Sequence, residues 1–299
     1  MTDQKWEQER AELSPKKHGR AGTRQGLRAE WIKITSVRST WICLVLIVVV
    51  GVSIAAFISN IEASRWADLS LIEKAQFDPV RVSQGGAILS EFVVGVLGVL
   101  VITSEYGSGM IRTTLASYSK RRSVLFSKVA VLSGVLFVVS ELTAFASFFV
   151  SRAVLISYGA KPFHGSIIAQ TKASAIPVLG IGDPGVVRAI ALGGVFLVLL
   201  GLLGMGIGFI IRHTAGAISI FVGLLLIVPI IISLLPASIT NSFQAYLPGT
   251  AGQAMSAVVS RSTGYAGELL TPWMGALVMT LWALGALVLG WIVLSRRDA

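Results

Sequence analysis

The sequence has little of what soluble enzymes and secreted proteins depend on. Only 13% of its 299 residues are charged, whereas 54% are hydrophobic, and the mean hydropathy is +0.77. A single cysteine, Cys43, excludes an intrachain disulfide. The three histidines, His18, His164 and His213, show no metal-ligand spacing. This composition excludes an ordinary soluble domain and indicates a membrane protein.

Motifs for nucleotide binding and hydrolysis are missing as well. The sequence contains no GxxxxGK[ST] loop, no HExxH and no GxSxG. We therefore expect no Walker-type ATP site, no catalytic residues, and no cofactor or metal on this chain.

Six apolar runs are long enough to cross a bilayer, which takes about 20 residues as a helix. Backbone groups inside the hydrocarbon must be paired within the segment, and runs such as 43–50 do not alternate as a β-barrel strand would. We predict an all-α, polytopic membrane protein with six transmembrane helices. The predicted spans are residues 40–59, 86–103, 124–150, 188–211, 215–235 and 273–294.

Basic residues are distributed unevenly in this six-span arrangement. Most of the 25 lysines and arginines fall in the N-terminal tail, between spans two and three, at Arg212 and after the last span. The positive-inside rule then predicts a cell-membrane protein with both termini cytoplasmic. The net charge of +10 is explained by topology and by attraction to lipid headgroups, so we expect no nucleic-acid partner.

The N-terminal region divides into two parts. Residues 1–26 are polar and predict a disordered cytoplasmic tail. Leu27, Trp31 and Ile34 share one helical face, which predicts an interfacial helix over 27–39 with its tryptophan at headgroup level. A solvated helix is the alternative. The six-span domain then covers residues 40–299.

Two acidic residues lie inside predicted spans, Glu91 in the second and Glu141 in the third. Intramembrane carboxylates are costly and are candidate functional groups. Glu91 is interpreted either as an interfacial residue or as one of a proton-sharing pair with Glu141. For Glu141, a translocation path or subunit interface competes with a structural hydrogen bond.

Glycine and proline mark spans four and five. Gly204 and Gly208 form a GxxxG spacing, which predicts close helix packing, either within the chain or between subunits. Pro229 predicts a kink in the fifth span.

The segment 104–123 is the long polar, basic connection between spans two and three. Glu105 at its start and the basic cluster at its end suit the two ends of a helix macrodipole. Ile111, Leu115 and Tyr118 share one face, which could insert into a groove of a soluble partner. An amphipathic loop resting on lipid is the alternative.

The run EYGSGMIRTTLASYSKRRSVLFSK, from Glu105 to Lys128, resembles the corresponding loop of type-2 ABC transporter permeases, the exporter class. In that family an E-Y-x-x-G-[TM]-[IL]-R-x-x-L run precedes a basic cluster and a lysine that opens the third span. The matching residues are Glu105, Tyr106, Gly109, Met110, Ile111, Arg112, Leu115, Arg121, Arg122 and Lys128. Residues 27–41 are similar to the family's helix before span one, with its E-x-x-K-x-x-[ST]-x-[RK] pattern. Ser119 departs from the proline that many members carry.

The resemblance implies the permease subunit of an ATP-driven exporter, which moves substrate outward with a separate cytoplasmic ABC ATPase that binds the ATP. It also implies a second permease, as a homodimer or heterodimer. The residues expected to couple to the ATPase are Glu105, Tyr106, Gly109, Ile111, Arg112, Leu115 and Tyr118. Those expected at the membrane interface are Lys120, Arg121, Arg122 and Lys128. A non-transporting accessory or sensor subunit and an intramembrane enzyme using Glu141 are the alternatives.

Overall fold

The computed structural model describes residues 23–110, 121–162, 175–258 and 270–297. Helices dominate these residues, and six of them are long and apolar enough to cross a membrane. The only strands in the described residues are β1 (Lys161–Pro162) and β2 (Pro177–Val178), which pair in parallel. The predicted all-α, six-span class is therefore confirmed.

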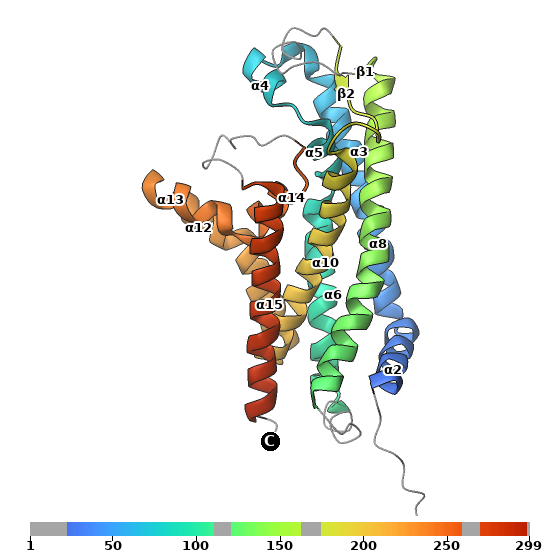
Figure 1. Ribbon diagram of the computed structural model, residues 1–299, viewed down its shortest axis with the longest axis vertical. Helices are drawn as coiled ribbons and strands as arrows, with labels where there is room; N and C mark the ends of the chain where they lie inside the picture. Colours follow the sequence, from blue (N-terminus) through green and yellow to red (C-terminus); the bar gives the residue numbers. More distant parts are fainter. Residues whose placement is uncertain (1–22, 111–120, 163–174, 259–269, 298–299) are drawn as a thin grey trace, which may run out of the picture.

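The six candidate spans end within a few residues of the predicted runs. They are α3 (Arg38–Ser64), α6 (Ala87–Gly107), α8 (Arg121–Ser157), α10 (Val186–Ile211), the composite fifth span Thr214–Ser233, and α15 (Pro272–Arg297). Figure 1 shows α3, α6, α8, α10 and α15 side by side along the long axis. The largest difference is α8, which extends about two turns beyond the predicted end of span three.

Short elements close the two ends of this bundle. The lower end in Figure 1 holds α2 (Thr23–Ser36), the end of α6, the start of α8 and the C-terminus, and is called here the α2 end. The opposite end holds η1 (Trp66–Asp68), α4 (Leu71–Gln76), α5 (Pro79–Gln84), β1 and β2. The connection from the fifth to the sixth span contains α13 (Ala237–Phe243), η3 (Gln244–Tyr246) and α14 (Pro248–Met255).

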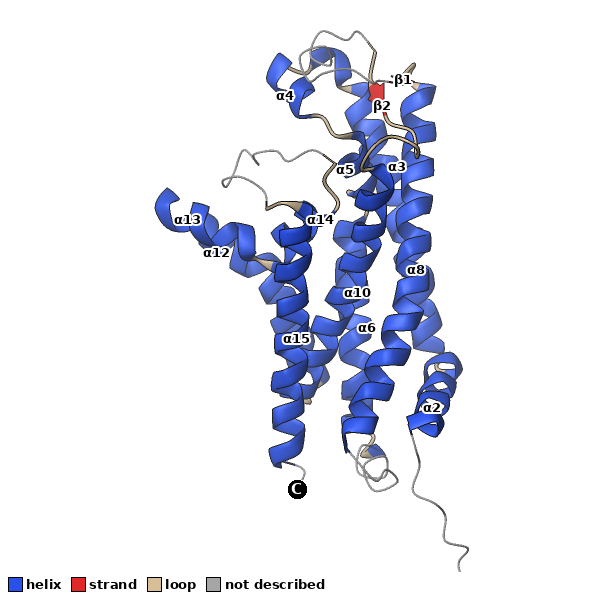
Figure 2. Ribbon diagram, in the orientation of Figure 1, coloured by secondary structure: helices blue, strands red, loops and turns tan. Residues whose placement is uncertain are grey.

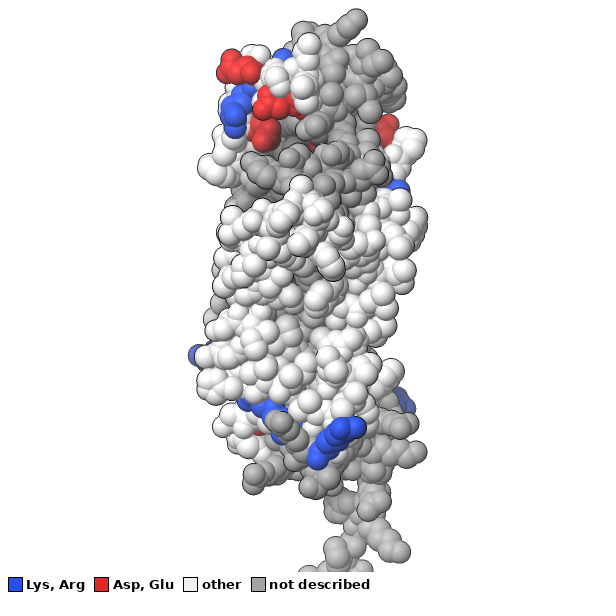
Figure 3. All heavy atoms as spheres, turned by 90° about the vertical axis from the view of Figure 1, so that its left-hand side faces the viewer, with Lys and Arg blue, Asp and Glu red and all other residues white. Residues whose placement is uncertain are grey.

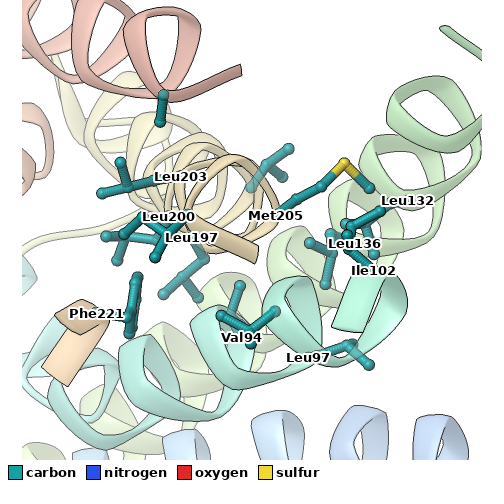
Figure 4. Close-up of a cluster of buried hydrophobic side chains, with 14 of the residues drawn as sticks. Val94, Leu97, Ile102, Leu132, Leu136, Leu197, Leu200, Leu203, Met205 and Phe221 are labelled. Carbon is teal, nitrogen blue, oxygen red and sulfur yellow. The ribbon is translucent and has the colours of Figure 1, made fainter. Parts of the chain in front are cut away.

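Helix α10 is the central element. In its most apolar window 72% of residues are buried, compared with 11% in the fifth span of similar hydropathy. Its glycines explain this position, because a Cβ atom at Gly204 would lie 2.3 Å from the carbonyl oxygen of Gly95 in α6. The GxxxG spacing thus serves packing within the chain. Figure 4 shows the surrounding core, where Met205 of α10 meets Leu132 and Leu136 of α8.

The fifth span is interrupted next to Pro229, where the sequence predicts a kink. Helix α11 (Thr214–Val222) passes into a π-helical turn, η2 (Gly223–Ile227), and then into α12 (Val228–Ser233). The Val228 amide donates to the carbonyl of Gly223, five residues earlier. Pro229 cannot donate the next amide bond, which favours this local rearrangement. In Figure 1, α12 and α13 turn away from the bundle.

Candidate functional site

Helix α2 is held against the bundle by one face. Ile34 is buried, and Leu27 packs on the hydrophobic core, whereas Trp31 and Ile32 are each 54% exposed. The buried face also carries Glu30, of which only 2% is exposed. Trp31 therefore points away from the protein, while the face of α2 that packs on the bundle includes the carboxylate of Glu30.

That carboxylate belongs to a cluster of four charged residues from three helices. Glu30 and Lys33 come from α2, Glu105 from the last turn of α6, and Lys128 from the beginning of α8. Lys128 Nζ lies 2.8 Å from Glu30 Oε2 and 2.5 Å from Glu105 Oε1. Lys33 Nζ lies 3.0 Å from Glu105 Oε1 and 3.2 Å from Glu30 Oε1. Positive and negative charges thus alternate and balance; we call these four residues the ion cluster.

Burial makes the ion cluster energetically sensitive. The side chain of Lys128 is 0% exposed, and those of Glu30 and Glu105 are 3% and 5% exposed. Removing one partner of such a buried pair leaves an uncompensated charge and costs about 3–5 kcal/mol. Lys33 is the exception, with 35% of its side chain exposed. The ion cluster therefore connects α2, α6 and α8, and only Lys33 lies at its exposed rim. We call such a side-chain connection between helices a joint.

Two opposing effects act on the rim lysine. Burial lowers the pKa of Lys33, but the hydrogen bond and charge of Glu105, followed by those of Glu30, raise it further than burial lowers it. The net pKa lies above the ordinary 10.5, so this lysine is charged at neutral pH.

Tyr106, which follows Glu105 in α6, makes a second connection between helices, and this connection is the second joint. The Arg212 guanidinium carbon lies 5.1 Å from the ring centroid of Tyr106, and Arg212 Nη2 donates to the carbonyl of Val293 in α15 at 3.1 Å. Arg212 ends α10 with a left-handed backbone at φ 61°. Adjacent residues of α6 thus link two sets of helices: Glu105 reaches α2 and α8, and Tyr106 reaches the end of α10 and α15.

A family model described as ABC-2 family transporter protein matches residues 26–179. The match covers just over half of the chain and contains the whole ion cluster. The chain belongs to the ABC-2 family of transporter proteins. A search of curated proteins found no match.

As an ABC-2 transporter membrane protein, the chain is a multi-pass component of a family whose membrane subunits are normally non-catalytic and generally work with an ABC ATPase. In the described part of the chain, no group of three or more His, Cys, Asp or Glu residues could hold a metal ion. The predicted resemblance to ABC transporter permeases is confirmed at the level of the family.

Most of the predicted coupling surface lies outside the described residues. This applies to the expected coupling residues Ile111, Arg112, Leu115 and Tyr118. Among the residues expected at the membrane interface, Lys120 and the side chains of Arg121 and Arg122 also lie outside them. Of the other coupling residues, Glu105 and Tyr106 form the two joints, and Gly109 follows α6 with a left-handed backbone at φ 71°. The coupling role of these residues stays a prediction.

Lys128 is placed differently from the expectation. It was expected among the basic residues at the membrane interface, whereas the structure buries its amino group between two carboxylates. The predicted interfacial helix begins at Thr23 instead of residue 27, and so includes the last residues of the predicted tail. Glu30 is the glutamate of the E-x-x-K pattern before span one, but the sequence analysis assigned it no role. Its i, i+3 spacing to Lys33 was the signal for a charged pair on α2.

The two intramembrane acids lie against α10. A Cβ atom at Gly194 would lie 2.5 Å from Glu141 Oε1, and this oxygen is buried with no hydrogen-bond partner among the described residues. Glu91 instead lines a cavity of about 280 Å³ together with the neighbouring Gly193, Gln84 and Arg81. Glu141 therefore lies directly against Gly194, whereas Glu91 lines a cavity that also borders Gly193.

Proposed function

We propose that this ABC-2 membrane component is the permease of an exporter, coupled to a separate cytoplasmic ATPase and paired with a second permease. The observation that carries the proposal is the ion cluster, which contains Glu105 at the start of the segment 104–123 and Lys128 shortly after its end. Glu105 is the third residue from the end of α6, and Lys128 lies two turns into α8. The segment between them is therefore anchored at both of its ends.

The arrangement supports transmission of force from a docked partner. Long helices are stiff, and the two helices that flank the segment meet α2 through buried charges. A displacement of the segment would thus move α2, α6 and α8 together rather than bend one connection. Tyr106 and Arg212 would pass the same movement to the ends of α10 and α15.

The α2 end is assigned to the cytoplasm in this proposal. Figure 3 shows Lys and Arg gathered below a broad uncharged band, while acidic and basic residues mix above it. Arg24, Arg28, Lys33 and Arg38 belong to α2 and the start of α3. This asymmetry supports cytoplasmic termini.

Within the coupling segment, Ile111, Leu115 and Tyr118 are proposed as apolar anchors in a groove of the ATPase. Arg112 meets an acidic rim, and Glu105 and Gly109 set the course of the chain out of α6. Lys120, Arg121 and Arg122 are proposed to contact lipid phosphates.

Replacing Leu115 with aspartate tests the docking surface. Leu115→Asp places a charge in the proposed groove and is expected to abolish co-purification of the ATPase from membranes. Leu71→Asp is the matched control, because it makes the same substitution at a leucine that is 67% exposed and lies at the opposite end. Retained binding by a correctly inserted Leu115→Asp protein would place the docking surface elsewhere.

Reconstitution in liposomes distinguishes a transporting permease from a non-transporting sensor subunit. An exporter permease with its ATPase in liposomes is expected to show substrate-stimulated ATP hydrolysis and accumulation of substrate on the side opposite the ATPase. Binding of the ATPase without either effect would instead favour a non-transporting accessory or sensor subunit.

A further inference from the structure

A cavity of about 430 Å³ opens beside the ion cluster, between α2, the start of α3 and the second half of α6. It extends along α6 from Leu97 to Glu105 and on to Ser108, just past the end of the helix. The eight helical steps from Leu97 to Glu105 correspond to about 12 Å. Leu97, Leu100 and Val101 line its apolar part. Its polar part is lined by Glu30, Lys33, Ser36, Ser39, Thr40, Ser104, Glu105 and Ser108.

The cavity lies where the apolar span α6 reaches the charged residues of the α2 end, which suits the boundary between headgroups and acyl chains. Figure 1 places α2, the start of α3 and the end of α6 together at one end of the bundle. In Figure 3 the uncharged band ends at the basic residues of this end. A molecule that fills the cavity therefore needs a polar head for the cluster and an apolar tail for α6.

The hydrogen-bonding groups of the cavity select the head. Glu105 Oε2 is buried with no hydrogen-bond partner among the described residues, although its side chain is only 5% exposed. Lys33 uses two of its three N–H groups on Glu30 and Glu105, which leaves one for an anionic acceptor. Glu105 and Lys33 both line the cavity, so a carboxylate with an unsatisfied oxygen and an ammonium group lie beside the same space.

The serine hydroxyls add acceptors rather than donors. Ser36 donates to the carbonyl of Lys33 at 3.1 Å, Ser104 to that of Leu100 at 2.6 Å, and Ser108 to that of Ser104 at 2.8 Å. Their oxygens keep free lone pairs. A headgroup with several N–H donors and one negative charge would match the Glu105 carboxylate, the serine oxygens and the Lys33 ammonium group.

We propose that the cavity binds an aminophospholipid, with its ammonium group on Glu105 and the serine oxygens, its phosphate on Lys33, and an acyl chain along Leu97, Leu100 and Val101. A choline head has no N–H to donate to Glu105. A glycerol head brings no cation for the carboxylate. Phosphatidylethanolamine provides both groups and would add a further connection between α2 and α6.

Photolabelling of the full-length chain tests this proposal and needs no ATPase. The protein is placed in phosphatidylcholine nanodiscs that contain a trace of phosphatidylethanolamine with a photoactivatable acyl chain, and labelled peptides are mapped by mass spectrometry. We expect label on α2 and on the second half of α6. Unlabelled phosphatidylethanolamine should compete about tenfold better than phosphatidylcholine or phosphatidylglycerol, a difference of about 1.4 kcal/mol.

A cavity-filling variant gives an independent reading. Ser104→Phe places a ring in the cavity and should reduce labelling of α6 about tenfold. Ser157→Phe is the control, because Ser157 is also an exposed serine bonded within its own helix but lies at the opposite end of α8. Full labelling of a folded Ser104→Phe protein would overturn the proposal.

The competition experiment decides even if the variant does not fold. Equal competition by phosphatidylcholine would show a groove for acyl chains only. Equal competition by phosphatidylglycerol would show that phosphate alone is recognised. Absence of label from α2 and α6 would show that lipid does not enter the cavity. Each of these results would overturn the assignment.

Discussion

The two ends of the bundle stabilise buried carboxylates in different ways. At the α2 end, Glu105 of α6 is balanced by lysines from α2 and α8. At the opposite end, Asp78 is also buried, but its Oδ1 accepts the amides of Val80 and Arg81 and its Oδ2 that of Val258. The charged pairs of Glu105 join long helices through side chains, whereas Asp78 mainly caps the N-terminus of the short helix α5. The comparison shows that the α2 end joins its helices through charged side chains, whereas at the opposite end neutral side chains, such as Tyr158 bonded to Asn60, connect the end of α8 with α3.

The sharpest test of this comparison is whether the two ends lie on opposite sides of the membrane. In a variant without Cys43, Ser70→Cys and Tyr118→Cys are expected to react with a membrane-impermeant maleimide from opposite sides. This result is all-or-none and is read by labelling intact and permeabilised cells. Reaction of both positions from the same side would contradict the proposed topology.

The largest effect on stability is expected for Lys128→Met, which removes the fully buried cation. Two carboxylates then face only Lys33, and the free energy of unfolding in detergent should fall by about 3–5 kcal/mol. The double variant Lys128→Met with Glu30→Gln restores charge balance and should recover much of this loss. Equal destabilisation by the single and double variants would argue against charge balance as the cause.

A smaller effect is expected at the opposite end for Asp78→Ala. This change removes the cap of α5 and the bond to Val258, and should cost about 0.5–2 kcal/mol in a denaturant titration. Asp78→Asn keeps a capping oxygen and is the control. A loss as large as that of Lys128→Met would erase the distinction between the two ends.

Lys33→Gln should be milder still, about 1 kcal/mol or less, because the rim lysine is partly exposed and its pairs are screened. The pKa of Lys33 is raised in the folded protein, so its contribution is complete below pH 10.5 and is lost as the pH rises through the folded value. Wild type and Lys33→Gln should therefore converge in stability under alkaline conditions. Parallel pH profiles would contradict this role.

The smallest effect is expected for Glu73→Gln, at the exposed capping box of α4. The Ser70 amide and hydroxyl hold the pKa of Glu73 below its ordinary value, so its contribution is present near neutral pH and is lost as the pH falls through the folded pKa. Proteolysis between η1 and α4 should rise slightly in acid for wild type but not for the variant. A change in global unfolding would show that this end is coupled to the spans.

The sequence predicted the spans well because hydropathy acts locally. Glu105 was assigned from the sequence to the coupling residues, and the structure gives it two lysine partners, Lys33 in α2 and Lys128 in α8. The burial of Lys128 could not be read from the sequence, since its partners lie 98 and 23 positions away. Hydropathy also could not predict which helix is central, because the fourth and fifth spans have similar values. They differ in how closely their glycines allow neighbouring helices to approach.

The adjacency of Glu105 and Tyr106 has a consequence for loop exchange between permeases. A transplanted segment that begins at residue 107 keeps both joints and can vary freely in its partner-facing residues. A segment that begins at residue 104 replaces two side chains whose partners lie at positions 33, 128 and 212. Chimeras should therefore tolerate the first boundary, whereas the second requires the distant partners to be transplanted as well.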